Sequence, residues 1–277
     1  MTCLKNIAET VARALVEDVD DGDLSAALIP SAATAKARVI SRQAAVICGV
    51  AWFDEVFRQL DASVTVDWEI QEGRKVAANQ KLCTLRGPAR SLLTGERTAL
   101  NFLQTLSATA TQARRYADAI EGTGAVILDT RKTLPGLRAA QKYAVACGGG
   151  KNHRMGLFDA ILIKENHIAA AGSLQAVVRA ARTLRPDVRI EVEVENLAQL
   201  EAALVAGADM ILLDNFALEE LKRAVRLNDH RVKLEASGGV NLQTVRAIAQ
   251  TGVDYISVGA LTKNIAAVDL SMRIAPD

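Results

Sequence analysis

One stretch of the chain, residues 128–167, concentrates the side chains and the backbone that bind anions. It contains three acidic residues, Asp129, Asp159 and Glu165. It also contains seven basic residues: Arg131, Lys132, Arg138, Lys142, Lys151, Arg154 and Lys164. The local charge is therefore +4, while the formal net charge of the chain is +1. Three consecutive glycines, 148–150, lie in its middle. Because charge-assisted hydrogen bonds to phosphate or carboxylate are the strong ones, the stretch predicts a site for a polyanionic small molecule, most simply a phosphorylated substrate.

Short apolar runs in the second half of the chain end in residues that could serve such a site. They span residues 126–129, 160–164, 190–195, 210–214, 234–237 and 255–259, with helical periodicity between them at about 137–147, 174–184, 197–206, 217–227 and 241–250. Strands that alternate with helices predict βαβ units and a parallel sheet. The last repeats are regular, with 23 residues from Asp214 to Ser237 and 22 from Ser237 to Gly259. Since the chain also has no GxGxxG fingerprint, an α/β barrel is favoured over an open sheet. The pattern gives six clear strands, whereas a complete barrel has eight.

The ends of these strands are expected to form one mouth, because active sites of α/β barrels lie at the carboxyl ends of the strands. The residues expected to converge there are Asp129, Arg131, Lys164, Glu193, Glu195, Asp214, Ser237 and Gly259. In residues 190–195, Val192 and Val194 share one face and three glutamates share the other. The outer helices should cover the valines, which turns the acids inward, where buried carboxylates need partners or a metal. The bases of residues 128–167 are available partners, although Lys142 and Lys151 are expected to be solvated.

The first half of the chain predicts a different α/β part. Residues 6–18 have the spacing of an amphipathic helix, and the polar loop 18–23 ends it. Residues 35–47 and 64–85 have strand-like, β-branched patterns, with a short helical segment at 51–60 between them. Two further helices are expected at 91–105 and 109–120. The pattern changes to that of the alternating strands and helices after residues 122–124.

Composition excludes several classes of protein. Near-zero net charge argues against a nucleic-acid binder with a broad basic face. No apolar run approaches the roughly 18 residues of a membrane span, and the N-terminus lacks the apolar core of a signal peptide. The four cysteines, Cys3, Cys48, Cys83 and Cys147, are scattered without a CxxC pair. They predict reduced thiols in a cytoplasmic protein.

Several longer motifs together resemble those of one enzyme family. They are DTRKTLPGLR (129–138), GGGKNHRMGLFDAILIKENHI (148–168), EVEVEN (191–196), LLDNF (212–216) and SVGALT (257–262), with GDLSAALIP (22–30), EGRKVAANQ (72–80) and TGERTALNFLQ (94–104) in the first half. They resemble the quinolinate phosphoribosyltransferases, also called nicotinate-nucleotide pyrophosphorylases (carboxylating). The resemblance covers nearly the whole chain, and the motifs follow the family's order.

The resemblance implies a fold of two parts and a defined reaction. An N-terminal open-faced α/β sandwich (residues 1–107) would precede an incomplete, seven-stranded α/β barrel (108–264), and a C-terminal tail (265–277) would pack back on the first part. The reaction joins quinolinate to phosphoribosyl pyrophosphate (PRPP), giving nicotinate mononucleotide, pyrophosphate and CO2 in de novo NAD synthesis. It uses Mg2+ and no organic cofactor, in a cytoplasmic homodimer that binds neither nucleic acid nor membrane.

The resemblance also implies roles for single residues. Arg131, His153 and Arg154 would hold the two carboxylates of quinolinate, with Arg97 contributed by the partner subunit. Arginine forks suit carboxylates. Lys132 and Lys164 would face the phosphoribosyl and pyrophosphate charges. His153 is also the one imidazole to consider for delivering a proton at C2.

The remaining roles concern the ribose, the metal and the 5′-phosphate. Glu193 and Asp214 would order the ribose hydroxyls and Mg2+, directly or through water. Four residues would allow the backbone to approach the 5′-phosphate near helix N-termini: Ser237, Gly238, Gly239 and Gly259. Many family members place a histidine after SVGALT, where this chain has Lys263-Asn264; Lys263 is expected to remain a phosphate-facing cation. Lys132, Lys164, Glu193 and Asp214 would form the catalytic set.

Other functions stay open on the residues alone. A Schiff-base lyase would use Lys164 as its nucleophile, but neighbouring arginines and acids suit anion binding better. A lipoyl or biotinyl carrier would explain EGRKVAANQ, but the DKA or MKM triplet of such carriers is absent from the sequence. Within the same superfamily, a molybdenum-transport-associated relative is the alternative, and EVEVEN and GGGKNHR favour the quinolinate enzyme over it.

Overall fold

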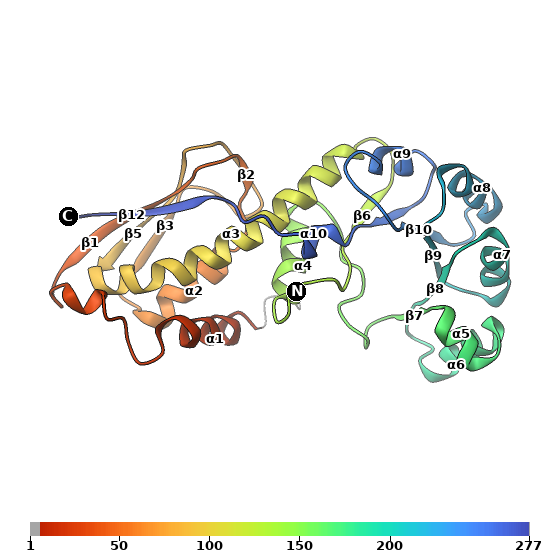
Figure 1. The fold of residues 1–277 in the computed structure, drawn as a ribbon, viewed down its shortest axis with the longest axis horizontal. Coiled ribbons are helices and arrows are strands. Elements are labelled where there is room, and N and C mark those ends of the chain that lie inside the picture. The colour runs from red at the N-terminus through yellow and green to blue at the C-terminus, as the bar shows by residue number, and fades with distance from the viewer. Residues whose placement is uncertain (1–5, 277) are drawn as a thin grey trace. The chain divides into compact units, whose positions relative to one another are not determined.

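The computed structural model describes residues 6–276, and its contacts divide the chain into two compact units (Figure 1). The first unit contains residues up to 114, residues 134–148 and residues from 264 onward. The second unit contains residues 115–133 and 149–263. Residues 134–148 thus pack within the first unit, although they lie inside the range 108–264 expected for the barrel. Cys3 lies outside the described residues.

The first unit is built on a four-stranded antiparallel sheet with helices on one face. The strand order is β12-β1-β5-β3, from β1 (Thr34–Ser41), β3 (Thr65–Trp68), β5 (Gln80–Pro88) and β12 (Leu270–Pro276). Two short strands, β2 (Ala45–Val46) and β4 (Lys75–Val76), form a separate pair. The helical elements are α1 (Ile7–Val19), the 3-10 turn η2 (Ala26–Leu28), α2 (Val50–Leu60), α3 (Ala89–Ala119) and α4 (Arg138–Cys147).

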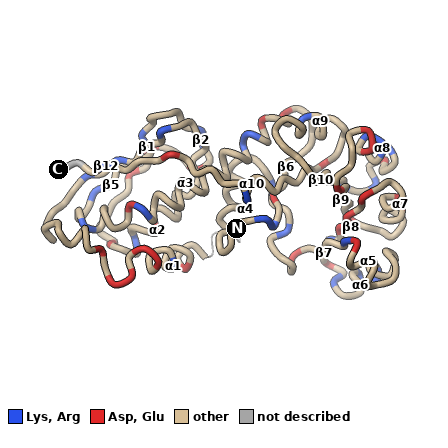
Figure 2. The backbone as a smooth tube through the Cα atoms, in the orientation of Figure 1, with Lys and Arg blue, Asp and Glu red and all other residues tan. Residues whose placement is uncertain are grey.

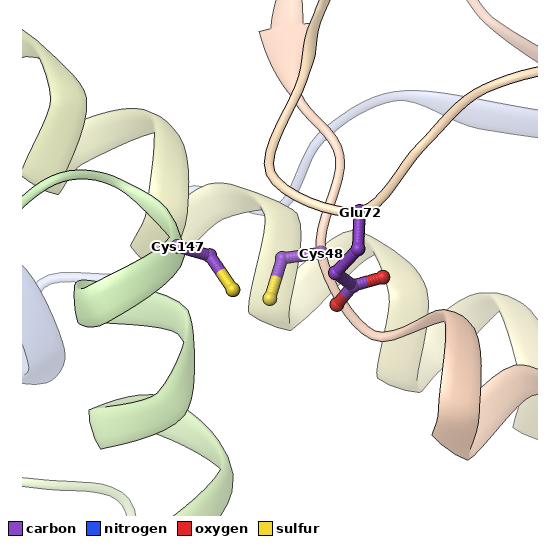
Figure 3. Close-up of side chains that lie close together, drawn as sticks. All are labelled: Cys48, Glu72 and Cys147. Atoms are coloured by element: carbon purple, nitrogen blue, oxygen red, sulfur yellow. The ribbon is translucent and has the colours of Figure 1, made fainter.

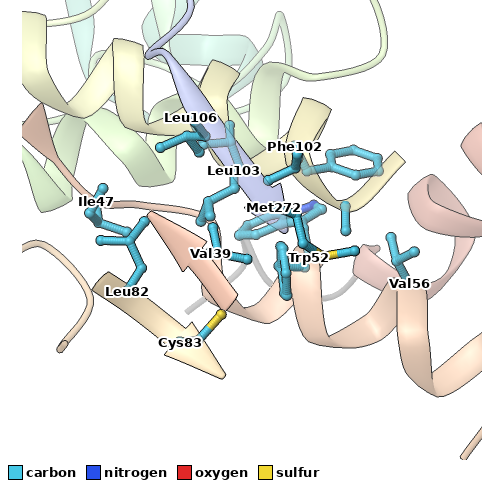
Figure 4. Close-up of a cluster of buried hydrophobic side chains, with 14 of the residues drawn as sticks. Val39, Ile47, Trp52, Val56, Leu82, Cys83, Phe102, Leu103, Leu106 and Met272 are labelled. Carbon is cyan, nitrogen blue, oxygen red and sulfur yellow. The ribbon is translucent and has the colours of Figure 1, made fainter. Parts of the chain in front are cut away.

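The sequence pattern of β1 explains the open face of this sheet. Buried and exposed residues alternate along the strand, as a period of two requires when only one face is covered. The covered face packs against α2 and α3. Figure 4 shows side chains from all these elements in one core, including Val39 of β1, Trp52 of α2, Leu103 of α3 and Met272 of β12. Strand β12 pairs with β1, so the end of the chain completes the first unit's sheet.

Helix α3 is one continuous helix of 31 residues. The expectation of two helices, at 91–105 and 109–120, is wrong. No Gly or Pro interrupts residues 105–109, and two of the three hydroxyl side chains there make hydrogen bonds to backbone carbonyls. The Ser107 hydroxyl donates to the backbone carbonyl of Cys48, and the Thr109 hydroxyl donates to the carbonyl of Thr105. These residues therefore continue the helix rather than end it.

Lys142 is a second correction. Its side chain is 0% exposed, whereas the sequence suggested a solvated lysine. In α4 it shares its buried surroundings with Ala140, Gln141, Ala144 and Val145. The helix thus buries a wider face than its charge pattern indicated. Lys151, by contrast, is exposed as expected.

The second unit is a six-stranded parallel sheet wrapped on one side by helices. The strands are β6 (Val126–Leu128), β7 (Ile161–Ile163), β8 (Ile190–Val194), β9 (Met210–Asp214), β10 (Lys233–Ser237) and β11 (Tyr255–Ser257), in the order β6-β11-β10-β9-β8-β7. The helices are α5 (Glu165–Ala171), α6 (Leu174–Leu184), α7 (Leu197–Ala206), α8 (Leu218–Asn228), α9 (Val245–Ala249) and α10 (Ala260–Lys263). Figure 1 shows α6, α7 and α8 outside the strands they follow or precede.

The barrel is incomplete at a defined edge. Six strands agree with the number read from the apolar runs, whereas the resemblance implied seven. On the free side of β6, Lys151 makes an isolated parallel bridge with Leu128. The Lys151 N–H donates to the Ile127 carbonyl at 2.8 Å, and the Asp129 N–H donates to the Lys151 carbonyl at 3.2 Å. A single residue thus occupies the place of a seventh strand, just before the residues His153 and Arg154.

Within the described part of the chain, no helix is long and apolar enough to cross a lipid bilayer.

Candidate active site

The carboxyl ends of the parallel strands surround a pocket in the second unit. Its volume is about 350 Å³, which lies in the range of small-molecule sites. The lining residues are Thr130, Arg131, Lys132, His153, Arg154, Leu162, Lys164, Glu193, Leu212, Glu235, Ser237 and Ser257. Seven residues proposed from the sequence are among them: Arg131, Lys132, His153, Arg154, Lys164, Glu193 and Ser237. The mouth expected from strand ends is therefore a real cavity.

Two arginines supply the basic wall of this pocket. Burial, together with the positive charge of Arg131, lowers the pKa of Arg154 below its ordinary value. The Arg154 guanidinium also donates a long hydrogen bond, 3.4 Å, to the carbonyl of Ala160. Two guanidinium groups that line one pocket repel each other, and an anion between them removes the repulsion. The arrangement suits a carboxylate or phosphate.

His153 lies deep in the pocket between this wall and two buried acids. Its Nδ1 accepts a hydrogen bond from the backbone N–H of Arg154 at 2.7 Å, so the neutral ring carries its proton on Nε2. Nε2 lies 2.8 Å from a carboxylate oxygen of Glu191 and 3.5 Å from one of Glu235. Burial opposes charging of the imidazole, but the hydrogen bond to Glu191 and the charges of Glu235 and Glu191 outweigh it and raise the pKa of His153.

Glu235 has a raised pKa. Burial and the neighbouring charge of Glu191 raise its pKa to about 8. It therefore carries a proton at neutral pH. A neutral Glu235 removes one negative charge from the barrel interior, where an uncompensated charge is costly.

Asp129 fixes the loop that carries His153. It follows β6, is fully buried, and its carboxylate accepts hydrogen bonds from the His153 backbone N–H at 2.9 Å and from the Asn152 side chain at 2.6 Å. The strand-end position had marked Asp129 as a mouth residue. Its side chain holds this loop through these two hydrogen bonds, and it is not one of the residues that line the pocket.

Lys164 and Glu193 form an ion pair at the ends of the adjacent strands β7 and β8. Their Nζ and Oε2 atoms are 2.5 Å apart, and the side chains are 42% and 14% exposed. The Lys164 amine is thus engaged by a carboxylate, whereas the nucleophile of a Schiff-base lyase must be free to attack a carbonyl carbon. His167 has a structural role, because its Nδ1 accepts the backbone N–H of Lys164 at the start of α5.

Asp214 ends β9, the strand next to β8. It lies in parallel register with Ser237 of β10, and its carboxylate accepts a hydrogen bond from the side chain of Asn215 at 2.8 Å. Figure 2 marks the acids of β8 and β9 in red. Two carboxylates on neighbouring strands are hard oxygen donors, which is the ligand type that Mg2+ prefers together with water and phosphate. The residues present therefore fit the expected metal.

The glycines after β10 and β11 differ in their surroundings. At Gly238, φ is +94° and an added Cβ would lie 2.1 Å from the Asn215 side-chain oxygen, whereas at Gly239 it would meet open space. At Gly259 an added Cβ would lie 3.0 Å from Lys132. Gly259 directly precedes α10, as expected, but α9 begins at Val245. The expected helix N-terminus beside Gly238 and Gly239 is therefore wrong, because a turn separates them from the helix.

Lys132 lines the pocket, whereas six other proposed residues are not among its lining residues: Arg97, Asp214, Gly238, Gly239, Gly259 and Lys263. Lys132 is exposed, and its carbonyl accepts the hydroxyl proton of the buried Thr262 at 2.8 Å, which fastens its loop to α10. Lys263 is exposed at the end of α10. Arg97 is exposed on α3 in the first unit.

Comparisons with known proteins decide the family. Residues 23–107 match the family described as "Quinolinate phosphoribosyl transferase, N-terminal domain", and residues 109–273 match its C-terminal domain. The chain belongs to the quinolinate phosphoribosyltransferase family. The family and fold class expected from the motifs are thus confirmed, and the chain is assigned to a class of phosphoribosyltransferases.

Individual relatives of this family match over nearly their whole length. The nicotinate-nucleotide pyrophosphorylase [carboxylating] of Mycobacterium leprae is 43% identical over 276 residues, which are 96% of this chain and 96% of the relative. A probable enzyme of the same name from Bacillus subtilis is 40% identical over 94% of this chain and 90% of its own. The solved structure of the nicotinate-nucleotide pyrophosphorylase from Francisella tularensis is 46% identical and superposes with a TM-score of 0.95, covering 97% of this chain and 96% of that one.

Glu191 and Glu235 are the site residues that sequence reasoning missed. Glu191 was expected only as one of the three glutamates on the inward face of its strand and was given no role in the site. Glu235 was overlooked, although it shares the inward face of residues 233–237 with the proposed Ser237, while Leu234 and Ala236 take the other face. The same period of two that identified the acids of β8 would have found it.

Proposed function

We propose that this pocket joins quinolinate to PRPP and decarboxylates the product, giving nicotinate mononucleotide, pyrophosphate and CO2, as the step that feeds de novo NAD synthesis. Family membership supports the reaction. The observation that carries it is the convergence of two guanidiniums, an ion-paired lysine and the strand-end carboxylate of Glu193 around one pocket. A dicarboxylate and a polyphosphate need this combination.

Quinolinate binds at the arginine wall. Arg131 and Arg154 each donate paired hydrogen bonds to its carboxylates. His153 extends the same wall toward the barrel interior. Both ring nitrogens of His153 already have partners in the chain, Glu191 and the backbone of Arg154. His153 therefore holds Arg154 in place as well as facing the substrate.

The phosphoribosyl group binds at the opposite side of the pocket. Lys132 and Lys164 neutralise the pyrophosphate, and the residues Ser237, Gly238, Gly239 and Gly259 give the 5′-phosphate access to backbone N–H groups, with Lys263 as a further cation. Glu193 and Asp214 hold Mg2+, directly or through water, and order the ribose hydroxyls. Mg2+ supplies charge neutralisation at the pyrophosphate.

The chemistry follows from these positions. As pyrophosphate leaves, C1 of the ribose develops positive charge, which the carboxylates of Glu193 and Asp214 offset while Lys132 and Lys164 stabilise the leaving group. The pyridine nitrogen then attacks C1. Its positive charge accepts the electrons of the bond to the 2-carboxylate, so that CO2 departs without an organic cofactor. A proton then replaces the lost carboxylate at C2.

The assembly is a cytoplasmic homodimer in which Arg97 of one subunit completes the quinolinate site of the other. Support comes from the exposure of Arg97 on α3 and from the need of a dicarboxylate for more than one arginine. In sequence, the catalytic barrel is assigned to residues 108–264 apart from residues 134–148, which pack within the first unit. The N-terminal sandwich is assigned to residues 1–107 and the tail to residues 265–277. No nucleic acid or membrane partner is required.

One assay tests the reaction. Purified protein with quinolinate, PRPP and Mg2+ should yield nicotinate mononucleotide, whereas nicotinate in place of quinolinate should not react. Product from nicotinate but none from quinolinate would overturn the decarboxylating reaction. A matched Lys164→Ala preparation excludes a contaminating enzyme.

A further inference from the structure

Two thiols of the first unit face each other outside the proposed active site. Cys48 lies between β2 and α2, and Cys147 is the last residue of α4. Figure 3 shows the two side chains pointing toward one another, with Glu72 beside Cys48. Both sulfur atoms and a Glu72 carboxylate oxygen lie within 4.8 Å of one another. Both cysteines are free thiols.

Helix α3 holds the backbones of both cysteines in place. The Cys48 N–H donates to the Ser107 hydroxyl at 2.9 Å, and that hydroxyl lies 3.2 Å from the Cys48 carbonyl. On the other side, Gly148 packs so closely on α3 that an added Cβ would lie 2.4 Å from the Ala110 carbonyl oxygen. The two thiols are therefore preorganised to meet, although they are far apart in the sequence.

The two thiols are chemically unequal. Cys147 is half-buried, and a hydrogen bond from Cys48, aided by one from Tyr143, lowers its pKa despite burial. Cys48 is fully buried, and desolvation raises its pKa well above the ordinary value. A half-buried thiol whose pKa is lowered, next to a fully buried thiol, is the arrangement of an attacking and a resolving cysteine.

A metal site is a weaker explanation of the same cluster. The Glu72 carboxylate already accepts the backbone N–H groups of Gly49 at 2.8 Å and Val50 at 3.2 Å, where it caps the start of α2. Two thiols and an occupied carboxylate fall short of the four ligands of a structural zinc site. The contact between the two thiols is better explained as a dithiol.

We propose that Cys48 and Cys147 form a thiol–disulfide exchange site that a small-molecule disulfide oxidises to an intrachain disulfide. The Cys147 thiolate attacks one sulfur of the oxidant and releases the first small thiolate. The Cys48 sulfur then attacks Cys147 in this mixed disulfide and releases the second. Two electrons pass from the protein to the oxidant, and the two thiol protons end on the released thiols. The site does not depend on the proposed reaction with PRPP.

Oxidised glutathione is the probe for a test on the full-length protein. After incubation and blocking of remaining thiols, peptide mass spectrometry should find a Cys48–Cys147 cross-link that dithiothreitol reverses. The thermal unfolding midpoint should rise by several degrees, because the link closes a loop of roughly 100 residues in the unfolded chain. A wild-type protein that stays reduced, or that links these cysteines only between chains, would overturn the proposal.

Single substitutions separate the two roles. Cys48→Ala should accumulate glutathione on Cys147, because the resolving thiol is gone, and Cys147→Ala should leave Cys48 unmodified. Cys83→Ala is the matched control, since Cys83 is also buried but lies outside this pair, and it should form the cross-link normally. A lasting glutathione adduct on wild-type Cys147, or stoichiometric zinc that protects both thiols from the probe, would also overturn the proposal.

Discussion

Arg131 and Arg154 define the pocket at the residue scale because their charges are close enough for one to lower the pKa of the other. Such a pair is costly without an anion and favourable with one. A planar fork matches a carboxylate with two parallel hydrogen bonds, whereas an ammonium offers a point charge. The geometry of Arg154, and not only its charge, should therefore matter for binding quinolinate.

Arg154→Lys tests this distinction. We expect KM for quinolinate to rise about 10- to 100-fold, the equivalent of one or two charge-assisted hydrogen bonds, while KM for PRPP changes little. Arg223→Lys, on the exposed surface of α8, is the matched control and should leave both constants unchanged. Steady-state kinetics with each substrate varied in turn gives the answer, and equal changes in both KM values would contradict the assignment of Arg154 to quinolinate.

Glu235 predicts a pH dependence of stability. Its pKa is raised from an ordinary 4.5 to about 8 in the folded protein, so between these values the folded state binds more protons than the unfolded state. Stability should therefore fall as pH rises through this window, by at most roughly 1.4 kcal/mol per pH unit. His153, whose pKa is also raised, acts in the same direction.

Urea unfolding of the ligand-free protein between pH 5 and pH 9 measures this slope. Glu235→Gln keeps the shape of the side chain without its titration and should flatten the curve. Asp187→Asn, on the exposed loop between α6 and β8, should leave the slope unchanged in this pH window. An unaltered slope in Glu235→Gln would show that Glu235 does not titrate as stated.

At the scale of elements, local periodicity predicted the strands well and the ends of helices poorly. The six apolar runs became β6 to β11 because each is a short buried strand, and inward acids on β8 followed from its alternation. The continuity of α3 was not predictable from residues 105–109 alone, because the Ser107 hydroxyl finds its partner in Cys48, far away in sequence. The burial of Lys142 likewise depends on packing that only the folded unit supplies.

Gly238 follows β10 and lies against Asn215, which follows β9. Any side chain at this position should therefore lower the free energy of unfolding. Gly238→Ala would combine a positive φ with a Cβ 2.1 Å from the Asn215 side chain and 2.9 Å from its backbone nitrogen. We expect a loss of about 2–4 kcal/mol in unfolding free energy. Gly239→Ala has a positive φ but open space, so it should cost only about 1 kcal/mol. Equal losses in urea titrations would contradict the packing argument.

At the scale of the whole molecule, the pocket lies in the second unit while Arg97 lies in the first. Motifs spread over both units led to the family, which the matches over residues 23–107 and 109–273 confirm. The roles of Glu191 and Glu235 were missed because each residue was considered only in the context of its own strand. The two glutamates lie close to His153 only in the folded chain, which brings three separate segments together. Sequence distance conceals such a cluster even where each residue's face is predictable.

Mixed dimers test the proposed sharing of sites between subunits. Arg97→Ala and Lys164→Ala should each be nearly inactive alone, since one lacks a carboxylate ligand and the other a cation for the leaving group. After subunit exchange, random pairing gives one intact site in each heterodimer, or roughly a quarter of wild-type activity. With folding and exchange verified by labelled subunits, activity no higher than that of the parents would argue against a shared site.

The measurement that tests the central claim most directly is the stoichiometry of the reaction with quinolinate labelled at its 2-carboxylate. With PRPP and Mg2+, the wild-type protein should release labelled CO2, pyrophosphate and nicotinate mononucleotide in equal amounts, and Lys164→Ala should release none of the three at a comparable rate. Pyrophosphate release without labelled CO2, or full activity of Lys164→Ala, would contradict the account.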